Sequence, residues 1–167
     1  MKTLFLLFDS LNRSVLGAYG GGIPTPNFDR LAERSTIFDS HFAGSLPCMP
    51  ARRDMQTGRL NFLHRSWGPL EPFDDSFAAQ LKQAGTYSHL VSDHYHYFED
   101  GGATYHTRYA SWEFIRGQES DPWAAMVAPP LDRFRAQYHP TQFEDHRNGH
   151  RLQGMINRTR IKDVGDF

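Results

Sequence analysis

The sequence predicts an α/β fold in which a mostly parallel sheet is flanked by helices. A continuous apolar run at 3–8 has the pattern of a strand that is buried on both faces of a parallel sheet, and segment 87–91 is predicted to be a second buried strand. Between these runs, segments 26–32 and 76–84 carry apolar residues at helical spacing. The 167 residues are 39% hydrophobic and 14% aromatic, which suffices for one folded domain with a substantial core.

The composition excludes several classes of partner. The chain carries 18 basic and 19 acidic residues, and this near balance favours neither nucleic acid nor an anionic membrane. Its single cysteine cannot form an internal disulfide, so no oxidising compartment is required. The apolar run at 4–8 is too short to span a bilayer, and no cleavage site of a secretory signal follows it. We therefore expect a cytoplasmic protein without nucleic-acid or membrane partners.

The first predicted strand, 3–8, ends at Asp9. Ligands of open α/β sheets gather at the carboxyl ends of the strands, so Asp9 is placed to hold a cation. Aspartate is also a common capping residue, and a purely structural role at the following turn is the alternative.

A helix is predicted over 26–32. Thr25 is placed to cap it, Pro26 suits its first position, and the apolar residues then fall on one face. This helix is expected to serve packing. A short strand is expected over 36–42, leading to the segment that holds the cysteine.

The only cysteine, Cys48, lies two residues before Pro50. Proline suits the first turn of a helix, and a helix from Pro50 to Gln56 would put Cys48 at its N-terminal entry, with Arg52 one turn further along. Backbone N–H groups, the helix dipole and a guanidinium would then meet at the cysteine, an arrangement that binds a tetrahedral oxyanion and lowers the pKa of a thiol. The alternative is an inert cysteine that serves as a small buried hydrophobe.

The second half of the chain continues the pattern. The helix at 76–84 has Asp74 or Asp75 as its predicted cap. A further strand is expected over 110–115, and segment 121–130, which contains proline and alanine, is predicted to be a surface connector.

Two histidines follow the second predicted strand, 87–91. In an extended segment alternate side chains share a face, so His94 and His96 would point the same way. Two imidazoles at the carboxyl end of a strand can bind metal, move protons or hydrogen-bond an anion. A polar strand end with satisfied histidines is the alternative.

The order of residues around the cysteine resembles a known family. Cys48, Pro50 and Arg52 form a Cys-x-Pro-x-Arg motif, and after four intervening residues Thr-Gly-Arg follows at 57–59. This three-part pattern is similar to that of the sulfatase family, within the alkaline phosphatase superfamily. In those enzymes the cysteine is oxidised to formylglycine, whose hydrated aldehyde is the nucleophile. An enzyme with an unmodified thiolate is a rival, but protein-phosphatase loops place five residues between Cys and Arg, and here three intervene.

The resemblance extends to the end of the first predicted strand. Sulfatases often have an acidic pair here followed by Leu-Gly-x-Tyr-Gly, and this chain keeps Asp9 and the Leu-Gly-x-Tyr-Gly tail at 16–20. The family's second Asp is replaced by Ser10, its Arg by Asn12 and its third acidic residue by Ser14. By resemblance, Asp9 alone carries over as a metal ligand.

Segment 86–96 resembles the family's Gly-Tyr-x-Thr-x-x-x-Gly-Lys-Trp-His. His96 occupies the position of the family's His and His94 that of its Lys. In the family these two side chains meet the sulfate and the leaving oxygen. The resemblance therefore implies that His96 hydrogen-bonds the substrate or protonates the leaving oxygen, and that His94 assists.

The implied function is metal-dependent hydrolysis of a sulfate ester. Asp9 and the modified Cys48 would hold a divalent cation, for which Ca²⁺ is the first choice and Mg²⁺ or Mn²⁺ are alternatives. Arg52 would stabilise the hydrate of the modified residue. Ser10 is similar to the non-acidic residue of the phosphonate monoester hydrolase branch, which keeps phosphonate and phosphodiester substrates open. A catalytically silent fragment or subunit that acts by association is the remaining alternative.

The resemblance covers about the first hundred residues, and sulfatases are considerably longer chains. We therefore expect residues 1–167 to form the N-terminal part of a sulfatase-like catalytic domain with an alkaline phosphatase-like fold. The remainder of the enzyme would be a second chain or a missing segment, and this part alone is expected to be inactive.

Overall fold

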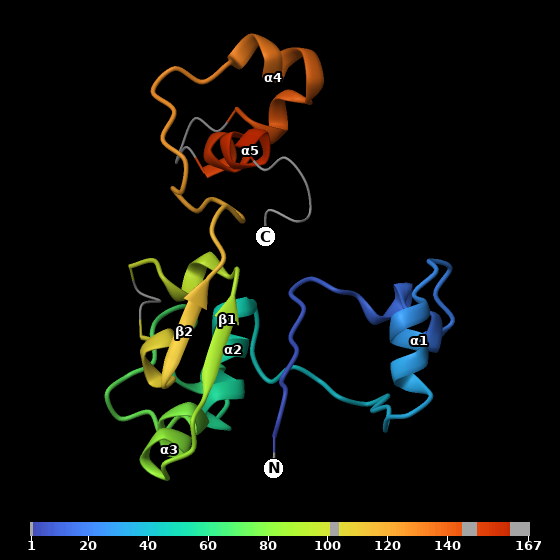
Figure 1. The fold of residues 1–167 in the computed structure, drawn as a ribbon, viewed down its shortest axis with the longest axis vertical. Coiled ribbons are helices and arrows are strands. Elements are labelled where there is room, and N and C mark those ends of the chain that lie inside the picture. Colours follow the sequence, from blue (N-terminus) through green and yellow to red (C-terminus); the bar gives the residue numbers. More distant parts are fainter. Residues whose placement is uncertain (1, 101–103, 145–149, 161–167) are drawn as a thin grey trace. The chain divides into compact units, whose positions relative to one another are not determined.

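The computed structural model describes residues 2–100, 104–144 and 150–160 (Figure 1). The chain divides into two compact units, Met1–Ala43 and Gly44–Phe167. Among the described residues, no helix has both the length and the apolar character needed to cross a membrane.

The first unit contains one α-helix and two short 3-10 helices. The helix α1 spans Pro26–Ala32, as the sequence predicts, with Pro26 in the first turn. Thr25 precedes it, but its side chain makes no capping hydrogen bond to the helix. Its hydroxyl instead accepts a 2.8 Å hydrogen bond from Gly17 N–H and donates to Asp29 Oδ1 at 3.3 Å. The threonine thereby fastens the start of α1 to the 3-10 helix η2, Gly17–Tyr19; η1 is Arg13–Val15.

The strands predicted at 3–8 and 36–42 are not formed in this unit. Both segments are without regular secondary structure, and the apolar side chains of 4–8 are 44–80% exposed. The physical reason is the absence of a partner: among the described residues of this unit, no other strand offers the backbone hydrogen bonds that a strand needs. An apolar sequence pattern alone cannot supply them.

The second unit holds a parallel pair of strands. The strands β1, His89–Ser92, and β2, Ser111–Phe114, pair in parallel with His89 opposite Ser111 (Figure 1). The predicted parallel sheet is therefore present in part, as two strands within the described residues. Alternate residues of β1 are exposed and half-buried, so the prediction of a strand buried on both faces is wrong here. The exposed face of β1, which carries His89 and Val91, lacks a covering layer in the described part of the chain.

Four α-helices lie among the described residues of this unit. They are α2, Cys48–Thr57; α3, Phe77–Gln83; α4, Leu131–Gln137; and α5, His150–Arg160. Its 3-10 helices are η3, Asn61–Leu63; η4, Tyr95–Tyr97; η5, His106–Arg108; and η6, Pro140–Gln142. The predicted helix over 76–84 is confirmed, but its cap is Ser76, whose Oγ accepts from Ala79 N–H at 3.2 Å.

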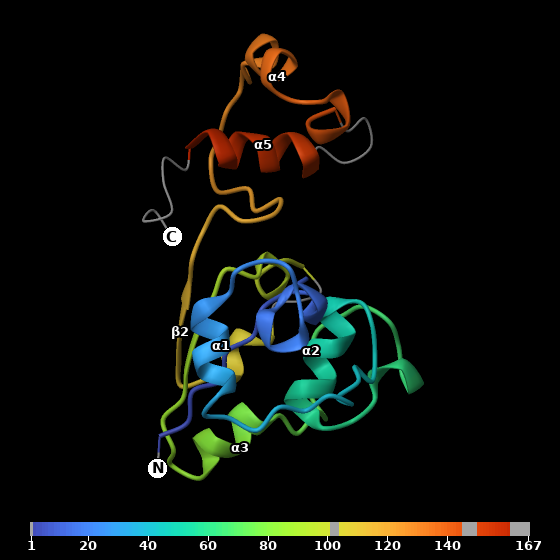
Figure 2. The same ribbon diagram turned by 90° about the vertical axis from the view of Figure 1, so that its right-hand side faces the viewer.

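Two clusters of buried side chains form the core. One is built from α4, α5 and the turns around them, and both helices can be followed in Figure 2. The other lies against the start of α2 and contains Met49, Leu70, Tyr97 and Tyr105, with Cys48 packed onto it. Burial raises the pKa of Tyr105 to about 12, and its hydroxyl lies 3.4 Å from Met49 O. The protonated phenol therefore fastens the first turn of α2 to this second cluster.

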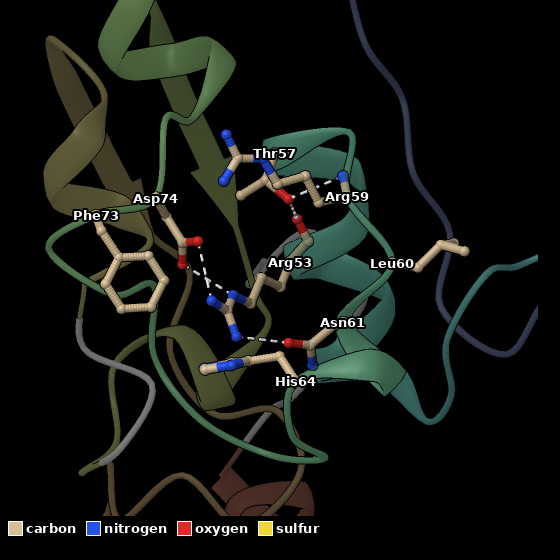
Figure 3. A pocket seen from close by; sticks show the side chains of 8 residues that line it. All are labelled: Arg53, Thr57, Arg59, Leu60, Asn61, His64, Phe73 and Asp74. Carbon is tan, nitrogen blue, oxygen red and sulfur yellow. Dashed lines mark hydrogen bonds and ion pairs between the residues drawn. The ribbon is translucent and has the colours of Figure 1, made fainter.

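A buried ion pair fixes the second half of α2 (Figure 3). Arg53 donates from Nε and Nη2 to the two carboxylate oxygens of Asp74 at 2.8 and 2.9 Å, and from Nη1 to Asn61 Oδ1 at 2.6 Å. Burial acts to raise the pKa of Asp74, but hydrogen bonds from Arg53 and the Glu71 N–H, together with the charge of Arg53, outweigh it and hold the pKa below 3.8. Asp74 is thus a bracing residue of α2 and not the helix cap that the sequence predicts.

Candidate active site

Cys48 is the first residue of α2, preceded by Pro47 as the cap. The helix begins two residues earlier than predicted, so Pro50 lies in its first turn and costs no hydrogen bond. The N–H groups of the first turn and the positive end of the helix dipole are therefore directed toward the region of Cys48. Gly58, with φ of +68°, ends the helix in the left-handed region that glycine adopts readily.

Arg52 follows one turn later and is buried, with 7% of its surface exposed. It and Cys48 both act on the phenol of Tyr97: burial raises the pKa of that hydroxyl well above 10, nearby Arg52 lowers it, and Cys48 raises it further. The three groups therefore share one electrostatic environment. This agrees with the prediction that Cys48 and Arg52 lie near the same face of a helix.

His94 lies next to the cysteine. A ring nitrogen of His94 is within 4.8 Å of Cys48 Sγ, and the histidine is 7% exposed. Its ring meets that of Tyr97 edge to face, with centroids 5.0 Å apart, and Ser92 Oγ accepts from its backbone N–H at 3.1 Å. A buried imidazole beside the sulfur is thus held by the end of β1 and by the aromatic core.

His96 lies close to His94, but the two residues are not part of the extended segment that the sequence predicts. The segment after β1 is not extended, because Tyr95–Tyr97 form the 3-10 helix η4. The two imidazole rings nevertheless meet edge to face with centroids 5.3 Å apart. The ring of His96 also meets the edge of Trp67, with centroids 4.8 Å apart.

Two acidic residues that the sequence did not single out, Glu99 and Glu119, complete this group. His96 Nδ1 lies 2.7 Å from Glu99 Oε1, and because an ionised carboxylate can only accept, that nitrogen carries hydrogen. Glu119 Oε1 is 3.7 Å from His94 Nδ1, and its Oε2 is 3.5 Å from His96 Nε2. The sequence could have indicated Glu119, because this residue follows β2 and the carboxyl ends of neighbouring parallel strands meet at one edge of a sheet.

Asp9 belongs to the first unit. It lies in an exposed turn, and Ser10 Oγ donates a 2.9 Å hydrogen bond to its Oδ1. Ser10 has φ of +57°, in the left-handed region. The cap of the next turn, η1, is Asn12, whose Oδ1 accepts from Ser14 N–H at 3.0 Å. The structural role considered for Asp9, capping of this turn, is therefore filled by Asn12.

The second unit thus gathers a cysteine at a helix N-terminus, a buried guanidinium, and two imidazoles that face carboxylates. Such a set offers a nucleophile, a stabiliser for an anion and groups that transfer protons to a leaving oxygen.

Comparison with known proteins gives a family match over most of the chain. The family model described as Sulfatase matches residues 2–133. Pig N-acetylgalactosamine-6-sulfatase is 41% identical over 58 residues, which are 34% of this chain and 11% of that protein. Human arylsulfatase D is 38% identical over 60 residues, which are 35% of this chain and 10% of that protein. The matched segments thus span about a tenth of the length of these relatives. No solved structure matches the chain significantly.

Proposed function

This chain belongs to the sulfatase family, and on that premise we propose that it is part of a metal-dependent hydrolase of sulfate esters whose nucleophile is formylglycine derived from Cys48. The observation that carries the proposal is the placement of Cys48. It is the first residue of α2, one turn before Arg52, and its Sγ lies within 4.8 Å of a ring nitrogen of His94.

The maturation machinery of the cell would oxidise Cys48 to formylglycine with an external oxidant. One hydroxyl of the hydrated aldehyde would then attack the sulfur of the ester as the bond to the alcohol oxygen breaks, and sulfate would leave as the aldehyde re-forms. The helix N-terminus at this residue favours the negative charge that develops on the attacking group and on the sulfate. Arg52 would stabilise the hydrate and its charge. Its planar guanidinium can donate two parallel hydrogen bonds, which lysine cannot copy.

The histidines would act on the leaving side of the reaction. A proton on His96 would pass to the leaving oxygen, and His94 would assist by hydrogen-bonding the sulfate. The 2.7 Å contact between His96 Nδ1 and Glu99 Oε1 supports this role, because it fixes the orientation of the ring.

The proposed metal ligands are Asp9 and the converted Cys48. Both offer oxygen atoms, which suit Ca²⁺ first and also Mg²⁺ or Mn²⁺, whereas an unconverted thiolate suits softer metals. The donor chemistry of this pair therefore fits a hard cation once Cys48 is modified. When bound, such an ion polarises the oxygens of the ester and favours the ionised nucleophile.

The substrate is proposed to be a small organic sulfate ester. The names of the relatives point to a sulfated sugar in one case and to an aryl sulfate in the other, and both classes serve as test substrates. Phosphonate and phosphodiester hydrolysis is a second candidate, favoured by Ser10 at a position that is acidic in many sulfatases. A silent subunit that acts by association is a third, favoured by the exposed apolar side chains at 4–8.

Peptide mass spectrometry of the segment that contains Cys48, with and without a carbonyl-reactive probe, tests the nucleophile. The protein should be isolated from cells that contain the maturation machinery. We expect an aldehyde mass that shifts with the probe, together with turnover of a sulfate ester that is lost in Cys48→Ala. An unmodified thiol from this source would contradict the formylglycine, and turnover that survives the substitution would exclude Cys48 as the nucleophile.

A further inference from the structure

We propose that Glu119 is a positioning residue that orients the imidazoles of His94 and His96 together. Its catalytic consequence rests on the proposed sulfatase function, whereas the orientation itself can be tested without turnover.

The first argument is the geometry of the carboxylate. Each of its oxygens faces a different ring: Oε1 is 3.7 Å from His94 Nδ1, and Oε2 is 3.5 Å from His96 Nε2. These distances are longer than direct hydrogen bonds and suit ion pairs or contacts through one water. Since the two rings also meet edge to face at 5.3 Å, one carboxylate can set the orientation of both.

The second argument is that Glu99 and Glu119 hold His96 from opposite nitrogens. Glu99 lies 2.7 Å from Nδ1, and Glu119 faces Nε2. Glu99 contacts His96, whereas Glu119 contacts His94 as well. Glu119 is therefore the acidic group among these contacts that couples the two histidines.

The third argument is the backbone of Glu119. Glu119 has a φ of +51°, which is a left-handed backbone conformation. Gly, Asn and Asp adopt this conformation more readily than other residues do. Such a conformation persists only where the surrounding structure enforces it, and it is often associated with functional positions. The surroundings of this loop must therefore supply that enforcement.

They do so through Asp121, which is fully buried two residues later. Its carboxylate accepts two 2.7 Å hydrogen bonds from the guanidinium of Arg116 and a 2.9 Å hydrogen bond from Gly117 N–H. The hydrogen bonds to Asp121 raise the pKa of Arg116 above its ordinary value, so the guanidinium stays charged. These bonds close residues 116–121 into a rigid loop with Glu119 at its turn.

Helix α5 supports the loop from the other side. Asn157, which is fully buried, donates from Nδ2 to Asp121 O at 2.9 Å. At Gly154 the helix passes so close that an added Cβ would lie 3.2 Å from Glu119 O. The contact explains the glycine at this position, and it places a helix behind the residue that faces the histidines.

The test compares Glu119→Gln with a matched control, Glu113→Gln, in the intact protein. Glu113 is an exposed glutamate of β2, the strand that leads into this loop. Glutamine keeps the size of the side chain and removes the charge that faces the rings. Two quantities are measured: the ¹⁵N NMR shifts of the imidazole nitrogens of His94 and His96, and kcat and KM for an aryl sulfate.

We expect Glu119→Gln to shift the ¹⁵N signals of the ring nitrogens of both histidines and to lower kcat by about tenfold to a hundredfold, by analogy with the loss when a carboxylate that orients a metal-bound histidine is removed. Glu119→Asp should restore part of kcat, and Glu113→Gln should change neither quantity. Unchanged ring nitrogens in Glu119→Gln would overturn the proposal whatever the activity. If the proposed sulfatase function is wrong, the unsubstituted protein will show no turnover of the aryl sulfate. The NMR comparison then still decides whether Glu119 orients the two histidines.

Discussion

At the scale of single residues, helix geometry explains why Cys48, the predicted nucleophile, and Arg52 lie on the same face of α2. Cys48 and Arg52 are four residues apart, and a helix brings residues at this spacing to the same face. Their relation is therefore local, and the sequence is enough to predict it. The same holds for the start of the helix, where two prolines flank the cysteine at positions 47 and 50.

Substitution of Arg52 by lysine tests whether shape or charge matters at this position. Lysine keeps the positive charge and loses the planar pair of donors, so we expect kcat/KM for a sulfate ester to fall by about a hundredfold. The aldehyde content at Cys48 is measured by mass spectrometry, and rates are expressed per converted chain. Arg59→Lys, an exposed arginine at the end of the motif, is the control. Equal rates for Arg52→Lys and the unsubstituted protein would contradict a bidentate role.

The acidic partners of the histidines show where prediction from sequence fails at this scale. His94 and His96 follow a predicted strand, and their proximity to each other is local. Glu119 meets them only because β1 and β2 are parallel neighbours and because a loop closes after β2. Pairing of distant segments is decided by tertiary contacts, which no local pattern of residues records.

At the scale of elements, α2 is held at both ends, and its second half depends on the buried pair of Arg53 and Asp74. The side chains are 6% and 3% exposed, and the guanidinium makes three hydrogen bonds within the protein. The sequence predicted a capping role for Asp74 or Asp75, because Asp before a helix commonly caps it. Ser76 takes that role, and the aspartate neutralises a buried cation that was not recognised from the sequence.

Asp74→Asn should destabilise the fold because it leaves the guanidinium of Arg53 buried without its counter-charge. Removal of one partner of a buried pair typically costs about 3–5 kcal/mol in the free energy of unfolding. Urea denaturation followed by circular dichroism measures this cost. Asp75→Asn, the exposed neighbour, serves as the matched control and should change the free energy by less than about 0.5 kcal/mol. Similar losses in the two variants would refute the bracing role of Asp74.

The same pair predicts the pH dependence of stability. The pKa of Asp74 in the folded protein is below its usual 3.8, so the folded state binds the proton more weakly than the unfolded state. The ionised Asp74 therefore stabilises the folded protein fully at pH values well above 3.8, where this carboxyl is ionised in both states. The stabilisation is lost as the pH falls through the lowered pKa of the folded state. Urea denaturation at intervals between pH 6 and pH 2 should therefore show a steeper loss of stability for the unsubstituted protein than for Asp74→Asn. Parallel curves would show that Asp74 does not titrate differently in the two states.

Buried polar contacts also tie α5 to the loop beside the histidines. Asn157→Ala would remove the donor to Asp121 O and the acceptor for Gln153 Nε2, both within a buried site. We expect a loss of about 1–3 kcal/mol in the free energy of unfolding. The control is Gln137→Ala on the exposed end of α4. Equal stability in Asn157→Ala and the unsubstituted protein would mean that α5 does not brace the loop.

At the scale of the whole molecule, the described residues contain two strands of a sheet that the sequence predicted to be larger. The helices at 26–32 and 76–84 were predictable, since each depends on its own residues, and the strand at 110–115 is formed because β1 pairs with it. The strand at 3–8 was not formed, because an apolar run becomes a strand only beside another strand. The same dependence on partners explains the large exposure of its side chains.

At this scale, substitution of Asp9 tests the proposed metal site. The carboxylate of Asp9 lies on an exposed turn and supplies oxygen ligands, which suit Ca²⁺ better than a soft metal. Removal of this carboxylate should therefore weaken the binding of Ca²⁺ more than that of a soft metal. We expect Asp9→Ala in the converted, intact protein to raise the Kd for Ca²⁺ by at least about tenfold, equal to about 1.4 kcal/mol. Isothermal titration calorimetry after treatment with a chelator measures this, and Asp39→Ala, an exposed aspartate of the same unit, is the control. Because calorimetry reads binding without turnover, an unchanged Kd would remove Asp9 from the metal site even if the substitution abolished activity.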